Sequence, residues 1–263
     1  MLLEVKDLRK AFHVGLIRRK EIIAVDKISF DVEPKKFISL VGESGSGKTT
    51  TAKMILRLLP PTSGSVMFEG RDVWRCKKID ELRWYWRQVH AIFQDPYASY
   101  NPLHKVDRIL YQVFNLTGHS GTDRDKMVRE ALTEVGLRPD EVLGKYPHEL
   151  SGGQRQRIMV ARCYLLSPKL IVADEPISMI DASTRAGVLK LFSKLREEYD
   201  TSVIFITHDL GLAYYVSDEI LIMYKGSIVE RGPPDDVMNR PQDSYTKRLR
   251  EDIPLMYRKW AGF

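Results

Sequence analysis

Short apolar runs recur along the first part of the chain, with polar or glycine-rich residues between them. The runs at residues 2–5, 28–32, 37–41 and 65–68 are typical of strands. They precede a longer region of mixed pattern, so we expect the sheet to begin antiparallel.

Three later runs, at residues 89–93, 170–173 and 202–206, are short and contain no charged residue. Parallel strands that are buried on both faces usually have this composition. A glycine-rich loop follows the run at 37–41, and a helix predicted at 48–59 ends at Pro60. Strand, loop and helix therefore succeed one another, and the core is predicted to be α/β.

Between residues 94 and 163 the strand pattern disappears and helical spacing replaces it. One amphipathic helix is expected to open at the capping pattern Thr122–Asp125 and to end near Gly136. A second helix is predicted at 155–166. The apolar stripe of the first helix comprises Val128, Ala131, Leu132 and Val135. Along the second helix, one stripe comprises Ile158, Ala161, Arg162 and Leu165.

These patterns predict one unit over residues 1–263. Its core would comprise residues 1–93 and 164–230, and residues 94–163 would form an inserted helical subdomain. Residues 231–263 are polar and dotted with proline, and they suggest a short carboxyl-terminal extension without a core of its own.

The composition of 43% hydrophobic and 29% charged residues is that of an ordinary globular protein. The net charge of +6 is scattered, which argues against nucleic-acid binding. Cys76 and Cys163 lack the spacing of a metal site and the number of a disulfide framework. No signal peptide and no apolar run of roughly 18 residues is visible, so we expect a cytoplasmic location.

Residues 42–49 match the phosphate-binding pattern GxxxxGK[ST] in full, between an apolar strand and a helix. Backbone N–H groups of such a loop surround phosphates, Lys48 would reach the β- and γ-phosphates, and the Thr49 hydroxyl would bind Mg²⁺. The predicted nucleotide contacts of this loop are Gly42, Glu43, Ser44, Gly45, Ser46, Gly47, Lys48, Thr49 and Thr50.

Polar residues also follow the later apolar strands, at the sheet edge where ligands of α/β proteins bind. Asp174 would hold Mg²⁺, and Glu175 would orient and deprotonate the water that attacks the γ-phosphate. His208 can hydrogen-bond the γ-phosphate or that water; a lone histidine is more often structural, but its position at the same sheet edge as Asp174 favours the functional role. Gln94 can coordinate Mg²⁺, and an ordinary loop glutamine is the alternative.

A second anion site is predicted at residues 150–154, LSGGQ, directly before the helix at 155–166. Ser151 can cap that helix, while Gly152 and Gly153 leave backbone N–H groups uncovered at its positive end. A single chain rarely needs two phosphate-binding sites for one nucleotide.

Aromatic residues give a weaker signal. Phe12 can stack on an adenine ring, with His13 as the neighbouring candidate, but a core phenylalanine explains position 12 equally well. The cluster Trp84–Trp86 is interpreted as packing.

In this order the motifs resemble the ATP-binding subunit of ABC transporters, over residues 2 to about 253. The corresponding segments are the P-loop, a Q-loop at Gln94, the LSGGQ signature, the acidic strand end at 170–175, a D-loop at 178–181 and an H-loop at His208. The stretches 94–102 and 240–254 resemble the branch that imports peptides, nickel and, in some organisms, oligosaccharides.

The resemblance implies a P-loop ATPase core with an antiparallel β subdomain, the inserted helical subdomain, and ATP and Mg²⁺ as ligands. Such subunits dimerise head to tail around two ATP molecules. The residues of one chain that would meet the Ser151, Gly152, Gly153 and Gln154 of its partner are Lys48, Thr49, Gln94, Asp174, Glu175 and His208, and Asp181 would also contribute.

Further partners follow from the resemblance: two transmembrane permease subunits, an extracytoplasmic solute-binding protein that acts through them, and a second ATPase subunit, either identical or homologous. Tyr97 and Tyr100 would contact the permease at the cytoplasmic face of the membrane. The D-loop reads SMID instead of an SALD-like run, but Asp181 is present.

Some members of this branch have a cysteine cluster in the extension. This chain has no cysteine beyond Cys163, so no iron–sulfur centre is expected. A non-transport ATPase attached to a soluble enzyme complex, such as a phosphonate-degrading one, is the alternative function.

Overall fold

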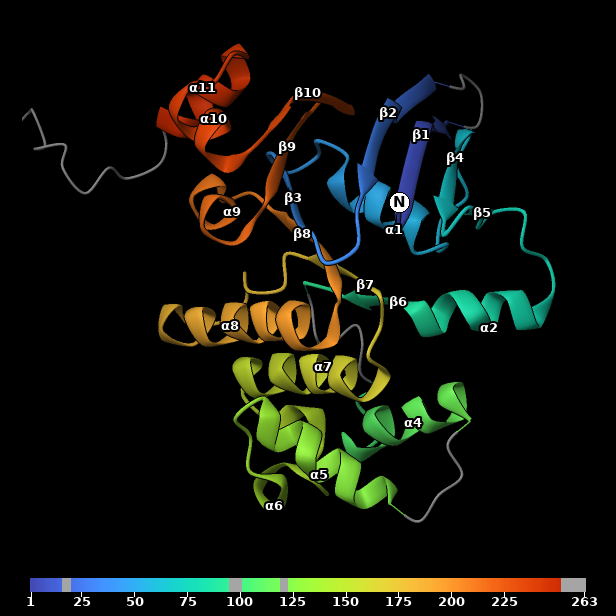
Figure 1. Ribbon diagram of the computed structural model, residues 1–263, viewed down its shortest axis with the longest axis vertical. Helices are drawn as coiled ribbons and strands as arrows, with labels where there is room; N and C mark the ends of the chain where they lie inside the picture. The colour runs from blue at the N-terminus through green and yellow to red at the C-terminus, as the bar shows by residue number, and fades with distance from the viewer. Residues whose placement is uncertain (16–19, 95–100, 119–122, 252–263) are drawn as a thin grey trace, which may run out of the picture.

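The computed structural model describes residues 1–15, 20–94, 101–118 and 123–251. Two sheets and the carboxyl-terminal helices form one end of the molecule, and a group of helices forms the other, with α7 and α8 between them (Figure 1). Some expected residues lie outside the described ones: Thr122 of the capping pattern, and Tyr97 and Tyr100, the expected permease contacts.

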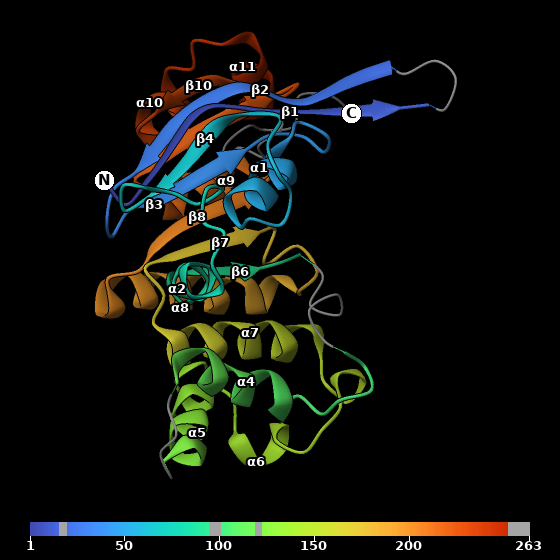
Figure 2. The ribbon, with the colours of Figure 1, turned by 90° about the vertical axis from the view of Figure 1, so that its right-hand side faces the viewer.

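The first sheet is antiparallel, as predicted, with strand order β2-β1-β4-β5. Its strands are β1 Leu3–Val14, β2 Lys20–Val32, β4 Ser63–Phe68 and β5 Arg71–Asp72. β1 and β2 pair as far as Val14 and Lys20, and their hairpin projects from the molecule (Figure 2). The predicted strands at 2–5 and 28–32 were too short, because the outer half of this hairpin is held mainly by backbone pairing and is largely exposed, including its apolar residues Ile22 and Ile23.

The second sheet has six strands in the order β10-β9-β3-β8-β7-β6. They are β3 Phe37–Val41, β6 Val89–Ile92, β7 Leu170–Asp174, β8 Ser202–Thr207, β9 Glu219–Tyr224 and β10 Ser227–Gly232. All neighbouring pairs are parallel except β9 and β10. The predicted α/β core is confirmed.

Helix α1, Lys48–Ile55, packs between the two sheets, where Ala52, Met54 and Ile55 share one core cluster with residues of both. The helix is shorter than the predicted 48–59, because Arg57 has a left-handed backbone with φ of 59° that a helix cannot continue through. A surface helix, α2 Ile79–Gln88, leads into β6.

The expected helical insertion is present, and no strand occurs among its described residues. It contains α4 Asp107–Thr117, α5 Arg124–Glu134, α6 Pro139–Val142, a 3-10 turn at Pro147–Glu149 and α7 Gly152–Leu166. The helix predicted at 155–166 is present as α7, and it is buried well beyond the predicted stripe of Ile158, Ala161, Arg162 and Leu165. Helices of the insertion cover one side of α7 and α8 Ala182–Tyr199 covers another, which leaves α7 little solvent-facing surface.

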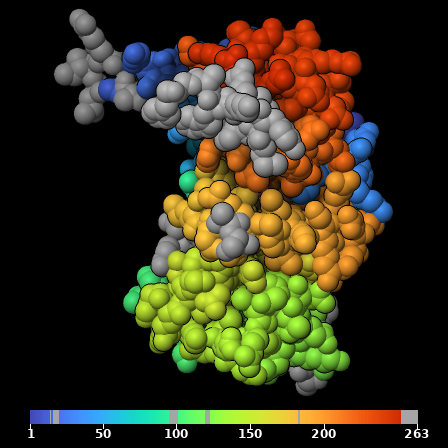
Figure 3. Space-filling model, turned by 90° about the vertical axis from the view of Figure 1, so that its left-hand side faces the viewer, coloured from blue at the N-terminus to red at the C-terminus, as the bar shows by residue number. Residues whose placement is uncertain are grey.

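The carboxyl-terminal residues form helices that the sequence did not predict: α10 Pro234–Asn239 and α11 Ser244–Glu251, next to α9 Leu210–Val216. Their buried residues Val237, Tyr245 and Leu249 share a cluster with β3, β9 and α9. Figure 3 shows these helices at the opposite end of the surface from the helical insertion. The described part of the extension therefore packs on the core of the six-stranded sheet.

Candidate nucleotide site

The loop of residues 42–47 connects a fully buried strand, β3, to α1. Its glycines are required by close contacts: a Cβ at Gly42 would lie 2.1 Å from the Met223 carbonyl oxygen, and Gly47 has φ of 109°. The Gly226 N–H donates to the Ser46 carbonyl at 2.9 Å. The turn between β9 and β10 thus supports the loop from the side.

Lys48 is buried and folds back on this loop. Its Nζ donates to the carbonyl oxygens of Gly42 at 2.6 Å and Glu43 at 2.8 Å, and to Ser46 Oγ at 3.4 Å. Burial lowers the pKa of Lys48, and the charges of Glu175, Asp174 and Glu43 oppose that shift. A buried ammonium is the kind of charged donor that forms strong hydrogen bonds with phosphate.

Asp174 ends β7, next to the start of α1. Burial raises the pKa of its carboxyl, while a hydrogen bond with Thr49 acts in the opposite direction. Its Oδ1 is buried and has no hydrogen-bond partner among the described residues. An unsatisfied carboxylate oxygen beside a threonine hydroxyl fits a Mg²⁺ that also binds nucleotide phosphates, since Mg²⁺ in such sites uses few protein ligands.

Glu175 follows Asp174 with a left-handed backbone, φ 46°, which is costly for a residue with a side chain. Its N–H donates to the Ile206 carbonyl at 2.9 Å, so the end of β8 holds it in place. Its Oε1 lies 3.3 Å from Nδ1 of the exposed His208. Both residues line a cavity of about 90 Å³, which is large enough for water.

The structure therefore brings Lys48, Thr49, Asp174, Glu175 and His208 to one edge of the six-stranded sheet. Because β3, β7 and β8 are parallel neighbours, their carboxyl ends meet there, as the arrows of β3 and β7 indicate (Figure 2). Gln94 lies two residues beyond β6 and is exposed. Its coordination of Mg²⁺ stays a prediction.

The signature segment forms the predicted cap of α7. Ser151 Oγ accepts from the Gln154 N–H at 3.2 Å, and the Ser151 N–H donates to Gln154 Oε1 at 2.9 Å. A Cβ at Gly152 would lie 3.2 Å from the Met179 carbonyl oxygen, and one at Gly153 would lie 3.0 Å from Thr184 Cγ2. The signature glycines thus pack against the D-loop and α8 of the same chain.

Asp181 of the D-loop caps α8, because its Oδ2 accepts from the Thr184 N–H at 3.0 Å and from the Thr184 hydroxyl at 2.7 Å. The P-loop contacts β9, the β9–β10 turn and α11. The signature segment instead contacts the D-loop and α8. Figure 1 places α8 between α7 and the six-stranded sheet, so the two loops belong to different layers.

The aromatic candidates differ in environment. Phe12 is 37% exposed on the projecting hairpin, with Lys10 Nζ 5.3 Å from the centre of its ring. It is not the core phenylalanine of the alternative interpretation, and adenine stacking stays a prediction for Phe12 and His13. In the cluster 84–86, Tyr85 is buried, but Trp86 is 38% exposed and lines a surface cavity, so packing does not account for Trp86.

Comparison with known proteins agrees with this geometry. The family model described as ABC transporter matches residues 25–178, more than half of the chain. The chain belongs to the ABC transporter family. Within that family it is an ATP-hydrolysing cassette, and ATP is its nucleotide.

Similar relatives include the oligopeptide transport ATP-binding proteins OppF and AppF of Bacillus subtilis (strain 168). OppF is 42% identical, with 97% of this chain and 83% of OppF covered. AppF is 38% identical, with 97% of this chain and 78% of AppF covered. The peptidoglycan transport ATP-binding protein YejF of Agrobacterium fabrum is 41% identical, although only 46% of its length is covered.

Among solved structures, the dimeric, post-hydrolysis state of the ATP-binding cassette MJ0796 bound to ADP and Pi is similar to this ABC cassette. It matches with a TM-score of 0.78 at 25% identity, over 89% of this chain and 99% of that chain. The fold prediction is therefore confirmed by the architecture and by this match.

Sequence reasoning missed the supports of the P-loop. Tyr245 Oη accepts from the Glu43 N–H at 2.8 Å, across 202 residues, and Met223 and Gly226 contact Gly42 and Ser46. No motif marks these residues. The signal that could have been read is the apolar run at 219–224, which predicts one more buried strand beside the P-loop.

Proposed function

We propose that this ABC cassette is the ATP-binding and hydrolysing subunit of an importer for peptides or a related solute such as an oligosaccharide or nickel. The observation that carries the hydrolytic part is the Glu175 carboxylate, held 3.3 Å from His208 at the edge that also contains Lys48 and Asp174. The peptide assignment is supported by the oligopeptide transport relatives, which align over 97% of the chain.

In this proposal the buried Lys48 ammonium binds the terminal phosphates of ATP. Glu175 accepts a proton from the attacking water, and His208 holds the Glu175 carboxylate or the γ-phosphate in place. Thr49, Asp174 and Gln94 would hold a Mg²⁺, which neutralises charge on the phosphates. The orphaned Oδ1 of Asp174 supports this ligand set.

The second ATP contact is assigned to a partner cassette, identical or homologous. Gly152 and Gly153 offer backbone N–H groups at the positive end of the 15-residue helix α7. The charged P-loop groups of the same chain contact other elements. A head-to-tail dimer would bring one chain's Ser151, Gly152, Gly153 and Gln154, with Asp181, to the ATP of the other.

Two transmembrane permease subunits are proposed as the partners that move solute, with an extracytoplasmic binding protein acting through them. Among the described residues, no helix is long and apolar enough to cross a membrane. Bound to the permease, the cassette is proposed to act at the cytoplasmic face of the membrane, as a peripheral subunit.

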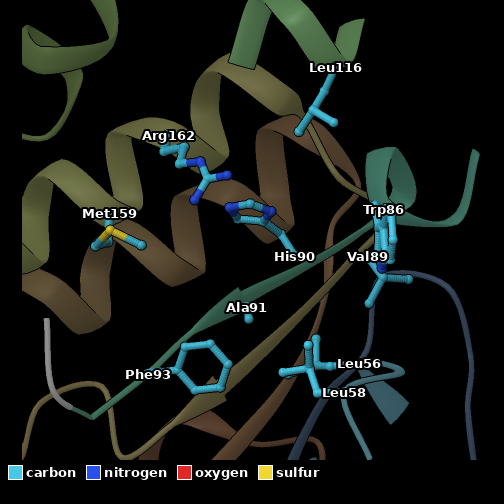
Figure 4. Close-up of a pocket in the computed structure, with 10 residues that line it drawn as sticks. All are labelled: Leu56, Leu58, Trp86, Val89, His90, Ala91, Phe93, Leu116, Met159 and Arg162. Atoms are coloured by element: carbon cyan, nitrogen blue, oxygen red, sulfur yellow. The ribbon is translucent and has the colours of Figure 1, made fainter. Parts of the chain in front are cut away.

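A groove of about 370 Å³ supports a permease contact (Figure 4). It lies where α2 and β6 meet α7 of the helical insertion, next to Gln94, and the 59%-exposed Leu58 and the half-exposed Trp86 line it. Apolar side chains that lie together around a surface groove mark sites of protein contact, whereas single scattered ones do not.

Co-purification tests the transport assignment. The tagged chain, extracted from membranes in mild detergent, is expected to retain two transmembrane subunits. Trp86→Ala should weaken that retention, while Tyr215→Ala, which removes an 83%-exposed aromatic ring of α9, serves as a control away from the groove. Retention of a soluble enzyme core instead would favour the phosphonate-type alternative, which the names of the relatives do not favour.

A further inference from the structure

At the entrance of the P-loop, two side chains hydrogen-bond to the backbone of the same residue, Glu43. The Glu43 N–H donates to Tyr245 Oη at 2.8 Å, and the Glu43 carbonyl accepts from Lys48 Nζ at 2.8 Å. Lys48 comes from the loop itself, whereas Tyr245 comes from α11 in the carboxyl-terminal extension. The extension therefore contacts the nucleotide loop directly.

Tyr245 is fixed in place on several sides. Its side chain is 2% exposed and stacks on Tyr224 of β9, with ring centres 4.2 Å apart and planes 27° apart. The guanidinium carbon of Arg248 lies 5.7 Å from the centre of the Tyr245 ring. Burial raises the pKa of Tyr245, which keeps its hydroxyl neutral and able to accept from an N–H group at physiological pH.

The hydrogen bonds of Lys48 show why the second hydrogen bond, from the Glu43 N–H to Tyr245, matters. An ammonium has three donors, and Lys48 directs them at Gly42, Glu43 and Ser46. To bind phosphate, Lys48 has to release at least one of these acceptors. The Gly42–Glu43 peptide unit, whose carbonyl accepts from Lys48 and whose N–H donates to Tyr245, then depends on Tyr245 to keep its orientation.

We propose that Tyr245 is a positioning residue for ATP binding, whose hydroxyl keeps the P-loop entrance in its binding conformation when Lys48 turns to the phosphates. The inference rests on the proposed role of Lys48 in this site. It assigns the carboxyl-terminal extension a part in nucleotide affinity, in addition to its packing on β9.

The test is Tyr245→Phe, which removes the hydroxyl and keeps the stacked ring. We expect the Kd for ATP to rise about 2- to 10-fold, the scale of one hydrogen bond, while the melting temperature and kcat at saturating ATP change little. Tyr214→Phe is the matched control, because it removes a hydroxyl that bonds Asp235, away from the P-loop.

A second variant separates positioning from packing. Tyr245→Leu loses ring and hydroxyl together, so it should lower the melting temperature and raise the Kd. If Tyr245→Phe binds ATP like wild type and only Tyr245→Leu is affected, Tyr245 merely packs and the inference is overturned. Failure of the wild-type chain to bind ATP would instead contradict the proposed function.

Discussion

The P-loop and the signature segment are both glycine-rich loops that open a helix, but their polar groups are in opposite states. At the P-loop, Lys48 is buried with its pKa lowered by that burial, and Asp174 has a buried oxygen without a partner. At the signature, Ser151 and Gln154 bond each other, and Asp181 bonds Thr184.

This difference separates the tasks of the two regions. The P-loop region contains charged groups that folding has removed from water. A phosphate and a cation would stabilise these groups, so ligand binding would offset their desolvation free energy. At the signature, Ser151, Gln154 and Asp181 are already hydrogen-bonded within the chain, and the segment offers a helix amino terminus. In the proposed function, the P-loop region captures ATP and the signature docks onto ATP that is already bound.

The largest expected effect is on hydrolysis. Glu175→Gln removes the proposed base while its amide keeps the shape of the side chain, so kcat should fall about 100-fold or more with ATP affinity retained. The measurement is steady-state phosphate release beside equilibrium binding. Turnover near wild type would remove Glu175 from the mechanism.

Lys48→Ala should raise the Kd for ATP about 10- to 100-fold, because a charged hydrogen-bond donor to phosphate is lost. The melting temperature of this variant should change little, because losing the hydrogen bonds of the ammonium is offset by removing its desolvation cost. Lys35→Ala, which removes an exposed lysine paired with Asp200, is the control for charge. Unchanged ATP binding in Lys48→Ala would contradict the phosphate assignment.

Ser151→Ala is expected to show the reverse pattern. Loss of the helix cap should reduce the free energy of unfolding by about 1 kcal/mol, measured by urea denaturation. ATP affinity of the monomer should stay at the wild-type value, because the proposed ATP contact of Ser151 lies in the partner's site. A stability equal to wild type would show that the cap contributes nothing.

The smallest effect concerns pH. Burial raises the pKa of Asp174 in the folded state, so its ionisation costs stability as pH rises above its unfolded pKa. Asp174→Asn should therefore be more stable than wild type at neutral pH, and the difference should vanish in acid, where Asp174 is protonated. Thermal melts across pH measure it. A constant difference at all pH values would point to packing instead.

The parts of the site that follow a local rule could be predicted from the sequence. GxxxxGK[ST] after a buried strand places Lys48, and Ser151 followed by Gln154 three residues later places the cap of α7. The burial of α7 on most sides could not be predicted, because it depends on helices that come from distant parts of the chain.

Long-range contacts account for most of what was missed. Tyr245 reaches Glu43 across 202 residues, and the polar, proline-dotted composition of the extension hides the three buried residues that dock it on β9. The outer half of the β1–β2 hairpin was missed for the opposite reason. It contains the apolar residues Ile22 and Ile23, but both are exposed, and backbone pairing rather than a buried face holds its strands together.

The central claim is that the ATP site is divided between two chains, and sedimentation velocity of Glu175→Gln, followed at both protein and nucleotide absorbance, tests it most directly. Saturating MgATP should convert the monomer into a dimer that carries two ATP molecules. With Ser151→Arg added, the chain should stay monomeric and still carry ATP. A Glu175→Gln chain that stays monomeric with ATP bound, or a Ser151→Arg monomer that loses its ATP, would contradict the division.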